Sequence, residues 1–150
     1  MKKIILLLMC VVFLFISCSQ QKETKETKEV KETNPLFAIV QDGKWGFVDK
    51  TGKVIINPQF DYAWKFSEGL ASVNIGGNKF KSGLVNGGKW GFIDKTGKYV
   101  INPQFDNAVY FSEGLAVVNI GATKDKDGFP QGGKYGFIDK TGKYVWNPTN

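Results

Sequence analysis

The chain has 150 residues, enough for one domain or one short repeat array but not for two large domains. It contains no His and no Arg, and both cysteines, Cys10 and Cys18, lie close to the N-terminus. The rest of the chain therefore lacks a His-assisted nucleophile, a thiolate nucleophile, a conventional zinc site and an intrachain disulfide. We expect no cofactor and no metal.

The N-terminus is typical of an export signal. Lys2 and Lys3 precede the mostly apolar residues 4–17. This stretch is too short to span a bilayer, which takes about 20 apolar residues, but it fits the hydrophobic region of a signal peptide. We therefore expect residues 1–17 to be a signal peptide.

The residues around Cys18 resemble the bacterial lipoprotein signal, in which an apolar, a tolerant and a small residue precede the cysteine that is acylated. Here Phe15, Ile16 and Ser17 occupy those positions. The resemblance implies that Cys18 becomes the first mature residue and carries acyl chains, which hold a protein at a membrane without spanning it. The expected location is the bacterial cell envelope, with the outer membrane or the cell surface favoured over the inner membrane.

Residues 18–33 are expected to form a disordered tether. The segment from Lys22 to Thr33 reads KETKETKEVKET, with four Lys and four Glu, and it cannot bury enough apolar surface to fold. A helix is the alternative, because Lys22 and Glu26 are spaced to pair. The same spacing also places like charges three residues apart, so a solvated coil is favoured.

The rest of the chain is a repeat. Residues 44–75 and 89–120 are identical at 25 of 32 aligned positions, and a third copy begins at Lys134. The period is 45 residues in both steps, which is typical of stacked supersecondary units. Abundant Gly and aromatic residues favour strands and turns over helices.

Each unit is predicted to contain a hairpin and one preceding strand. Alternation places Trp90 and Phe92 on one face of a strand and Ile93 on the other. Residues 94–97 suit a tight turn in which Gly97 has positive φ, and Pro103 is expected to end the returning strand. The preceding strand is predicted at residues 115–120 and, in the first unit, at residues 36–40.

The resulting fold class is all-β, with a tandem array of three three-stranded meander units at about 36–57, 70–102 and 115–147. We expect residues 34–150 to form this domain. A closed propeller needs at least four blades, so an open solenoid-like stack is favoured.

The motif KWGFIDKTGKYVI, with FSEGLA downstream, resembles the WG-repeat family of bacterial proteins, also called KWG repeats. The resemblance covers residues 36–150. It implies all-β structure and a binding or scaffolding role, and it carries no catalytic residues that could be transferred. The chain departs from the family at Tyr135, which replaces Trp, and in its longer segments 76–88 and 121–133.

The repeated acids have local structural interpretations. Asp49, Asp94 and Asp139 occupy a turn position that favours Asp, and Glu68 and Glu113 precede a Gly in a tight turn. Residues 125–128 resemble part of a calcium loop. An EF-hand register would place Thr123 and Lys134 where acidic ligands are required, so a surface turn is favoured.

Candidate ligand-binding residues come from comparing the first two copies. Most differences within strands are mild, whereas the connector replaces Asn107 and Val109 with Tyr62 and Trp64, and Lys65 with Tyr110. Tyr62, Trp64 and Tyr110 are therefore candidate ligand contacts, with packing between units as the favoured alternative.

The sequence thus predicts a non-catalytic, lipid-anchored binding or scaffolding module. Its partners would be the membrane, through acyl chains on Cys18, and an envelope protein or glycan. An enzyme acting on an envelope polysaccharide is the alternative. Nucleic acid is not an expected partner, because export and the lack of Arg both argue against it.

Overall fold

The computed structural model describes residues 34–80, 85–126 and 129–148, which belong to one compact unit, Glu32–Asn150. The expected signal peptide (1–17), the acylation site Cys18 and the tether (18–33) lie outside the described residues. Within the described ranges, no helix is long and apolar enough to cross a membrane.

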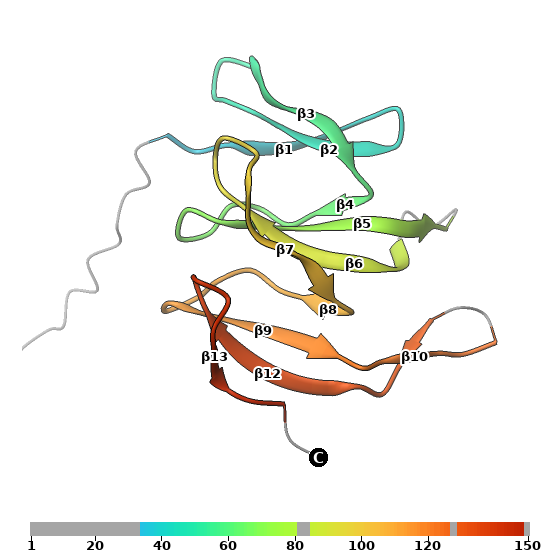
Figure 1. Ribbon diagram of the computed structural model, residues 1–150. Helices are drawn as coiled ribbons and strands as arrows, with labels where there is room; N and C mark the ends of the chain where they lie inside the picture. Colours follow the sequence, from blue (N-terminus) through green and yellow to red (C-terminus); the bar gives the residue numbers. More distant parts are fainter. Residues whose placement is uncertain (1–33, 81–84, 127–128, 149–150) are drawn as a thin grey trace, which may run out of the picture. The chain divides into compact units, whose positions relative to one another are not determined.

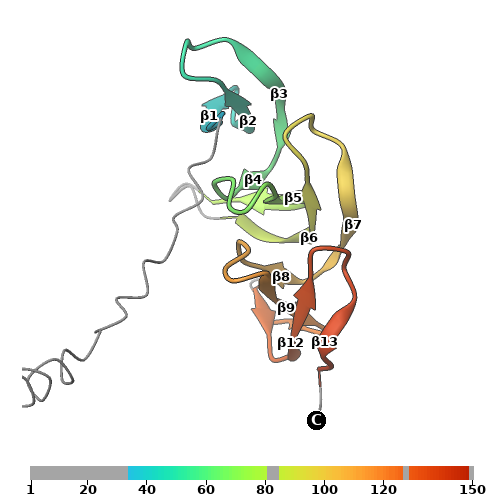
Figure 2. The same cartoon turned by 90° about the vertical axis from the view of Figure 1, so that its left-hand side faces the viewer.

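The regular structure of this unit is β throughout, and its strands form three antiparallel sheets stacked in chain order (Figures 1 and 2). The first sheet consists of β1 (Phe37–Gln41), β2 (Lys44–Val48) and β3 (Val54–Phe60). The second consists of β4 (Tyr62–Ala63), β5 (Ala71–Lys79), β6 (Val85–Ile93) and β7 (Tyr99–Phe105). The third consists of β8 (Asn107–Ala108), β9 (Leu115–Ile120), β12 (Lys134–Asp139) and β13 (Tyr144–Trp146), with β10 (Thr123–Lys124) and β11 (Pro130–Gln131) forming a separate ribbon. This open array of sheets is the predicted fold class.

The sheets differ from the prediction in strand number. The second and third each have a fourth strand, because Tyr62 and Ala63 of one connector pair with β5, and Asn107 and Ala108 of the next pair with β9. Two-residue strands are too short to show an alternating pattern in the sequence. The longer segment 76–88 is in part a continuation of the β5–β6 hairpin, whose pairing extends to Lys79 and Val85.

The strands that return after the hairpin turns also run further than expected. β7 continues through Pro103 to Phe105, so the prediction that this proline ends the strand is wrong. The strand tolerates Pro103 because β7 lies at the edge of its sheet and its pairing is bulged, with Trp90 opposite Phe105 but Phe92 opposite Ile101.

This bulge explains the glycine that follows the Trp in the first strand of the hairpin, as in Trp90-Gly91. A Cβ atom on Gly91 would lie 2.6 Å from the Ile101 carbonyl oxygen and 2.7 Å from the Pro103 nitrogen. The backbone of β7 therefore crosses Gly91 too closely for any side chain. Gly46 stands in the same position against β3.

The hairpin turns follow the predicted chemistry. Gly97 has a φ of +86°, as the turn prediction requires, and its N–H donates to the Asp94 carbonyl. The first hairpin joins β1 to β2 through Asp42 and Gly43, both with positive φ, which is the predicted two-residue turn.

Two hydrophobic clusters lie between the sheets. Eight buried residues make the first cluster, between the first and second sheets: Phe47, Ile56, Phe60, Ala63, Phe66, Ala71, Val73 and Ile93. The second cluster, between the second and third sheets, contains the residues 45 positions later, with Leu70 in addition: Phe92, Ile101, Phe105, Ala108, Phe111, Ala116, Val118 and Ile138.

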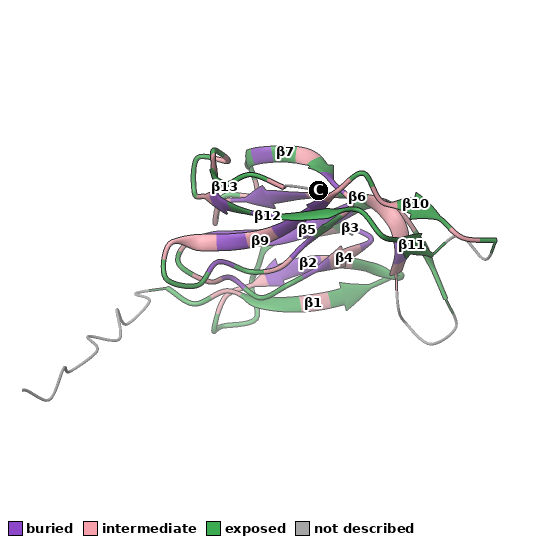
Figure 3. Cartoon of the chain, turned by 90° about the horizontal axis from the view of Figure 1, so that it is seen from below, coloured by how far each residue is buried: buried purple, intermediate pink, exposed green. Residues whose placement is uncertain are grey.

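The second sheet thus serves both clusters, since Phe92 faces one and Ile93 the other, as the alternation predicts. Figure 3 shows buried residues concentrated in the stacked strands and exposed ones along β1 and β10. Both clusters draw on residues of the unit Glu32–Asn150, so this unit has a hydrophobic core of its own, as a domain that can fold alone requires.

Candidate functional site

An aromatic cluster forms where β2, β6 and the two connectors meet, and it contains all three candidate ligand contacts. Its members are Trp45, Tyr62, Trp64, Trp90 and Tyr110. The Tyr62 ring centroid lies 4.7 Å from that of Trp45 and 5.9 Å from that of Trp90. Tyr62 is half-buried between these two repeated tryptophans, so the packing interpretation applies to it.

Trp64 and Tyr110 form the exposed part of the cluster. Their ring centroids are 6.2 Å apart with an interplanar angle of 65°, and Trp64 is joined to Tyr62 at 5.7 Å. The side chains of Trp64 and Tyr110 are 37% and 40% exposed. The two rings therefore make a partly exposed corner.

A cation lies against this corner. The Lys65 Nζ atom is 5.5 Å from the centroid of the Tyr110 ring, within the range of a cation–π contact. Because Lys65 and Tyr110 occupy equivalent positions in successive copies, the repeat brings an ammonium group and a phenol ring together at one place.

The acidic residues of the hairpin turns hold the backbone. The Asp94 carboxylate accepts hydrogen bonds from the Thr96 hydroxyl and from the backbone N–H groups of Thr96 and Lys98, at 2.6, 2.8 and 3.2 Å. The Thr96 hydroxyl in particular holds the pKa of Asp94 below its usual value. Asp49 and Asp139 repeat this arrangement, so all three have the expected local structural role.

Glu68 acts over a longer range than its sequence context indicates. Its carboxylate accepts a hydrogen bond from the Gly114 N–H at 3.1 Å and lies 2.9 Å from the Lys140 Nζ atom. The bond from Lys140, followed by that from Gly114, holds the pKa of Glu68 below its usual value. Glu68 therefore connects the second unit to the third.

An ion pair that recurs in the first two copies was not predicted from the sequence. Lys44 lies 2.5 Å from Asp61, and Lys89 lies 2.6 Å from Asp106. Asp61 also accepts hydrogen bonds from the backbone N–H groups of Gly76 and Gly77. The sequence did contain a signal for this pair, because the Lys and the Asp are both present in the first two copies and are 17 residues apart in each.

Asp106 has the same role in the third sheet. Burial acts to raise its pKa, but the hydrogen bonds from Lys89 and from the Ala122 and Gly121 N–H groups outweigh burial, so the pKa lies below its usual value. A groove of about 450 Å³ lies beside this pair, lined by Ile75, Gly76, Gly87, Gly88, Lys89, Asp106, Ala122, Lys124 and Pro130. The described residues contain no group of three or more His, Cys, Asp or Glu side chains that could hold a metal ion.

Comparison with known proteins places two segments of this architecture in one family. Residues 45–78 and 90–122 match the family described as WG containing repeat. The matches begin at Trp45 and Trp90 and cover the bulged hairpin, the connector and the strand after it. No curated protein and no solved structure matches the chain.

Proposed function

Residues 45–78 and 90–122 match WG containing repeats, and we propose that the folded domain that carries them is a non-catalytic module that binds an envelope glycan at Trp64 and Tyr110. The observation that carries the proposal is the exposed corner between these two rings. Neither ring is needed to build the repeat, since Val109 and Lys65 occupy the equivalent positions in the other copy.

The chemistry of the corner suits a carbohydrate. A pyranose ring presents a flat face of C–H groups, which stacks on an electron-rich aromatic face, and Trp offers the largest such face. Tyr110 stands at 65° to Trp64, so a sugar stacked on the indole would have the phenol ring at its side. Binding residues are disproportionately found in connecting segments of this kind.

The charge of Lys65 favours a glycan that carries negative groups. Its ammonium group lies beside Tyr110 and is partnered there by an aromatic face, which leaves its charge available to an anion. Residues 34–150 also carry more positive than negative charge, with 14 Lys against 10 Asp and Glu. We therefore expect a glycan that carries carboxylate groups, such as peptidoglycan, to bind better than a neutral one.

The proposed location is the cell envelope, with acyl chains on Cys18 holding the domain at a membrane. The signal-like residues 1–17 support export, and the Lys- and Glu-rich residues 18–33 support a tether between the membrane and the domain. A binding module held in this way would meet the glycans of its own cell surface.

Co-sedimentation of the domain, residues 32–150, with purified peptidoglycan tests the proposal. Trp64→Ala should abolish sedimentation while the melting temperature stays close to that of the parent domain, because the side chain is 37% exposed. Lys65→Gln should weaken binding, and so should added salt. Phe80→Ala is the matched control, since Phe80 is 36% exposed and lies outside the cluster.

Four outcomes would overturn the proposal. If Trp64→Ala lowers the melting temperature, Trp64 has a packing role. If the variant melts normally and still sediments with peptidoglycan, Trp64 is not part of the binding site. Retention of an envelope protein, with no retention of glycan, would replace the ligand class. Release of soluble fragments from the peptidoglycan would instead favour the alternative of a polysaccharide-acting enzyme.

A further inference from the structure

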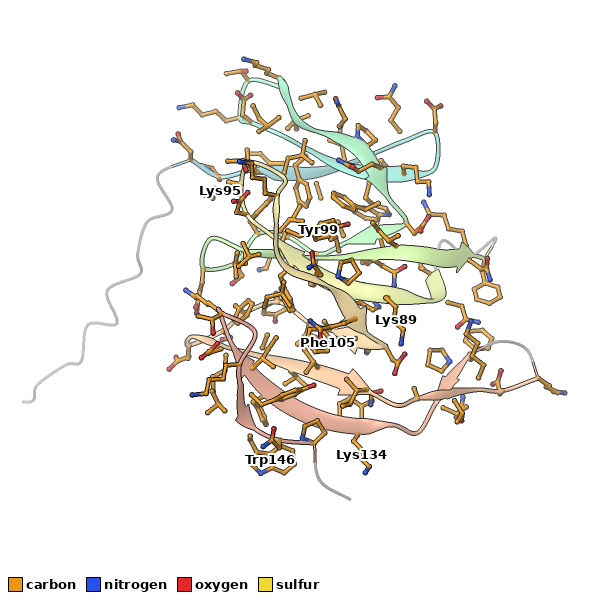
Figure 4. All side chains as sticks on the ribbon, viewed as in Figure 1. Lys89, Lys95, Tyr99, Phe105, Lys134 and Trp146 are labelled. Atoms are coloured by element: carbon orange, nitrogen blue, oxygen red, sulfur yellow. The ribbon has the colours of Figure 1, made fainter. Side chains whose placement is uncertain are left out.

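The outermost face of the third sheet exposes residues whose counterparts in the other sheets are buried or half-buried. Tyr135, Phe137 and Trp146 are 56%, 40% and 50% exposed. Phe137 stands opposite Trp146 on β13 and opposite Val117 on β9, so these side chains share one face, here called the third-sheet outer face. Figure 4 shows Trp146 at the end of the stack, on the side away from the second sheet.

The equivalent face of the second sheet is completely covered. Phe92, the counterpart of Phe137, is 0% exposed, and Ile101, the counterpart of Trp146, is 4% exposed. The cover is the third unit, which contributes Ala116, Val118 and Ile138 to the second core cluster. The third-sheet outer face is therefore built as half of a sheet-on-sheet interface.

The first sheet exposes the complementary half. Phe37 stands opposite Val48, and Val48 opposite Val54, across its three strands. Phe37 is 51% and Val54 42% exposed. Their counterparts in the third unit, Ala116, Ile138 and Tyr144, all pack against the second sheet. The outer face of the first sheet therefore corresponds to the face of the third sheet that packs on the second sheet.

Charge complementarity identifies the occupant. Lys140, in the hairpin turn of the third unit, pairs with Glu68, two residues before the leucine that begins the preceding repeat strand. Lys95, in the second unit, contacts Asn34, which also stands two residues before the equivalent leucine. Glu113 stands two residues before the leucine of the third unit, and Lys50 lies in the hairpin turn of the first unit. Neither has an ion-pair partner among the described residues.

We propose that the domain stacks head to tail on a second copy of itself, the third-sheet outer face of one copy covering the first-sheet outer face of the next. Glu113 of one copy then meets Lys50 of its neighbour, as Glu68 meets Lys140 within the chain. The interface repeats the step between the second and third sheets.

The shape of the exposed face supports the same occupant. A hollow of about 360 Å³ on it is lined by Val109, Tyr110, Ser112, Leu115, Val117 and Phe137. One unit earlier, the connector occupies this place, where Phe111 packs on Phe92 and the Ser67 hydroxyl donates to the Phe111 carbonyl. Phe37 of the second copy stands where Ala71 and Ala116 stand in the other sheets, and its larger ring can enter the hollow.

Such an interface joins two different surfaces, so it can propagate from copy to copy. Sedimentation equilibrium of the domain should show a weight-average mass that rises beyond that of a dimer as concentration increases. Phe137→Asp should abolish the association. Val100→Asp should leave it unchanged, because Val100 is 45% exposed but lies on the second sheet. A domain that stays monomeric up to about 1 mM would overturn the proposal.

The charge pair tests the direction of stacking. Glu113→Lys and Lys50→Glu should each weaken association about five- to tenfold, since like charges then face each other. The two variants mixed together, and the double variant, should recover it. Lys98→Glu makes the same charge change in the second unit and should have no effect.

A tail-to-tail dimer is the contrary outcome. If Phe137→Asp abolishes association but Lys50→Glu does not weaken it, two third-sheet faces are in contact and head-to-tail stacking is wrong. Tyr110 contacts Trp64 and also lines the hollow, so it is varied in neither test. Stacking is tested at Phe137, Glu113 and Lys50 and glycan binding at Trp64 and Lys65, so failure of one proposal can be told from failure of the other.

Discussion

The Lys140 ammonium group lies 2.9 Å from the Glu68 carboxylate, although 72 residues separate the two in the sequence. The same carboxylate accepts the Gly114 N–H, so a single side chain connects the second unit to both the hairpin turn and the strand entry of the third. Contacts of this kind specify the position of one sheet relative to the next, which apolar burial alone does not do because it is not directional.

The lowered pKa of Glu68 makes part of this connection dependent on pH. A carboxyl group whose pKa is lower in the folded state stabilises that state above its unfolded pKa, close to 4.5 here, and the contribution is lost as the pH falls through the folded value. The urea midpoint of the parent domain should therefore fall below about pH 4.5 more steeply than that of Glu68→Gln. Equal slopes for the two proteins would show that the contact adds no stability.

Two turn glycines separate backbone strain from packing. Gly97 and Gly52 have φ values of +86° and +84°, but a Cβ atom on Gly97 would lie 3.3 Å from the Ile56 side chain, whereas Gly52 has nothing within 4 Å. Gly52→Val should cost about 1–2 kcal/mol from strain alone. Gly97→Val should cost about 1–3 kcal/mol and always more than Gly52→Val, as measured by urea unfolding. A smaller loss at Gly97 would contradict the proximity to Ile56.

Asp61 holds the start of the long hairpin and should be sensitive to truncation. It is 8% exposed and accepts bonds from Lys44, Gly76 and Gly77. Asp61→Ala removes the charged acceptor of two backbone N–H groups and of Lys44 and should cost about 1.5–3 kcal/mol, because hydrogen bonds to a charged group are stronger than neutral ones. Asp61→Asn keeps an acceptor oxygen and should cost less. If both variants unfold at the same denaturant concentration, the backbone bonds contribute little and the charge dominates.

Acylation of Cys18 remains a prediction from the sequence. In the full chain, Cys18→Ala should block processing and move the protein from the detergent phase to the aqueous phase in a partition assay. Cys10→Ala is the matched control, because Cys10 follows the bulky Met9 and should be dispensable. A Cys18→Ala protein that is cleaved and membrane-bound as before would remove the anchor.

The sequence predicted those parts of the fold that depend on local chemistry. The alternation of Phe92 and Ile93 placed each on the correct side of β6, and Gly97 has the positive φ that its turn requires. Both signals lie within a few residues of the feature they specify.

The parts that were missed depend on contacts between distant segments. Pro103 does not end β7, because a residue without a backbone N–H is tolerated at a bulge and at the edge of a sheet. The pairing of Lys44 with Asp61 crosses two strands, and the contact of Glu68 with Lys140 crosses two units. The candidate site was predicted in part, since Tyr62, Trp64 and Tyr110 do meet, but Trp45 and Trp90 could not be placed against Tyr62 without the stacking of the sheets.

The two core clusters use the same eight side chains, 45 residues apart, and this has a consequence for the gene. Every inner copy must fit both the copy before it and the copy after it, so recombination between copies exchanges surfaces that are already compatible. An in-frame gain or loss of one whole copy would preserve the core contacts between neighbours. The length of such an array can therefore change in steps of one copy without a change in the core.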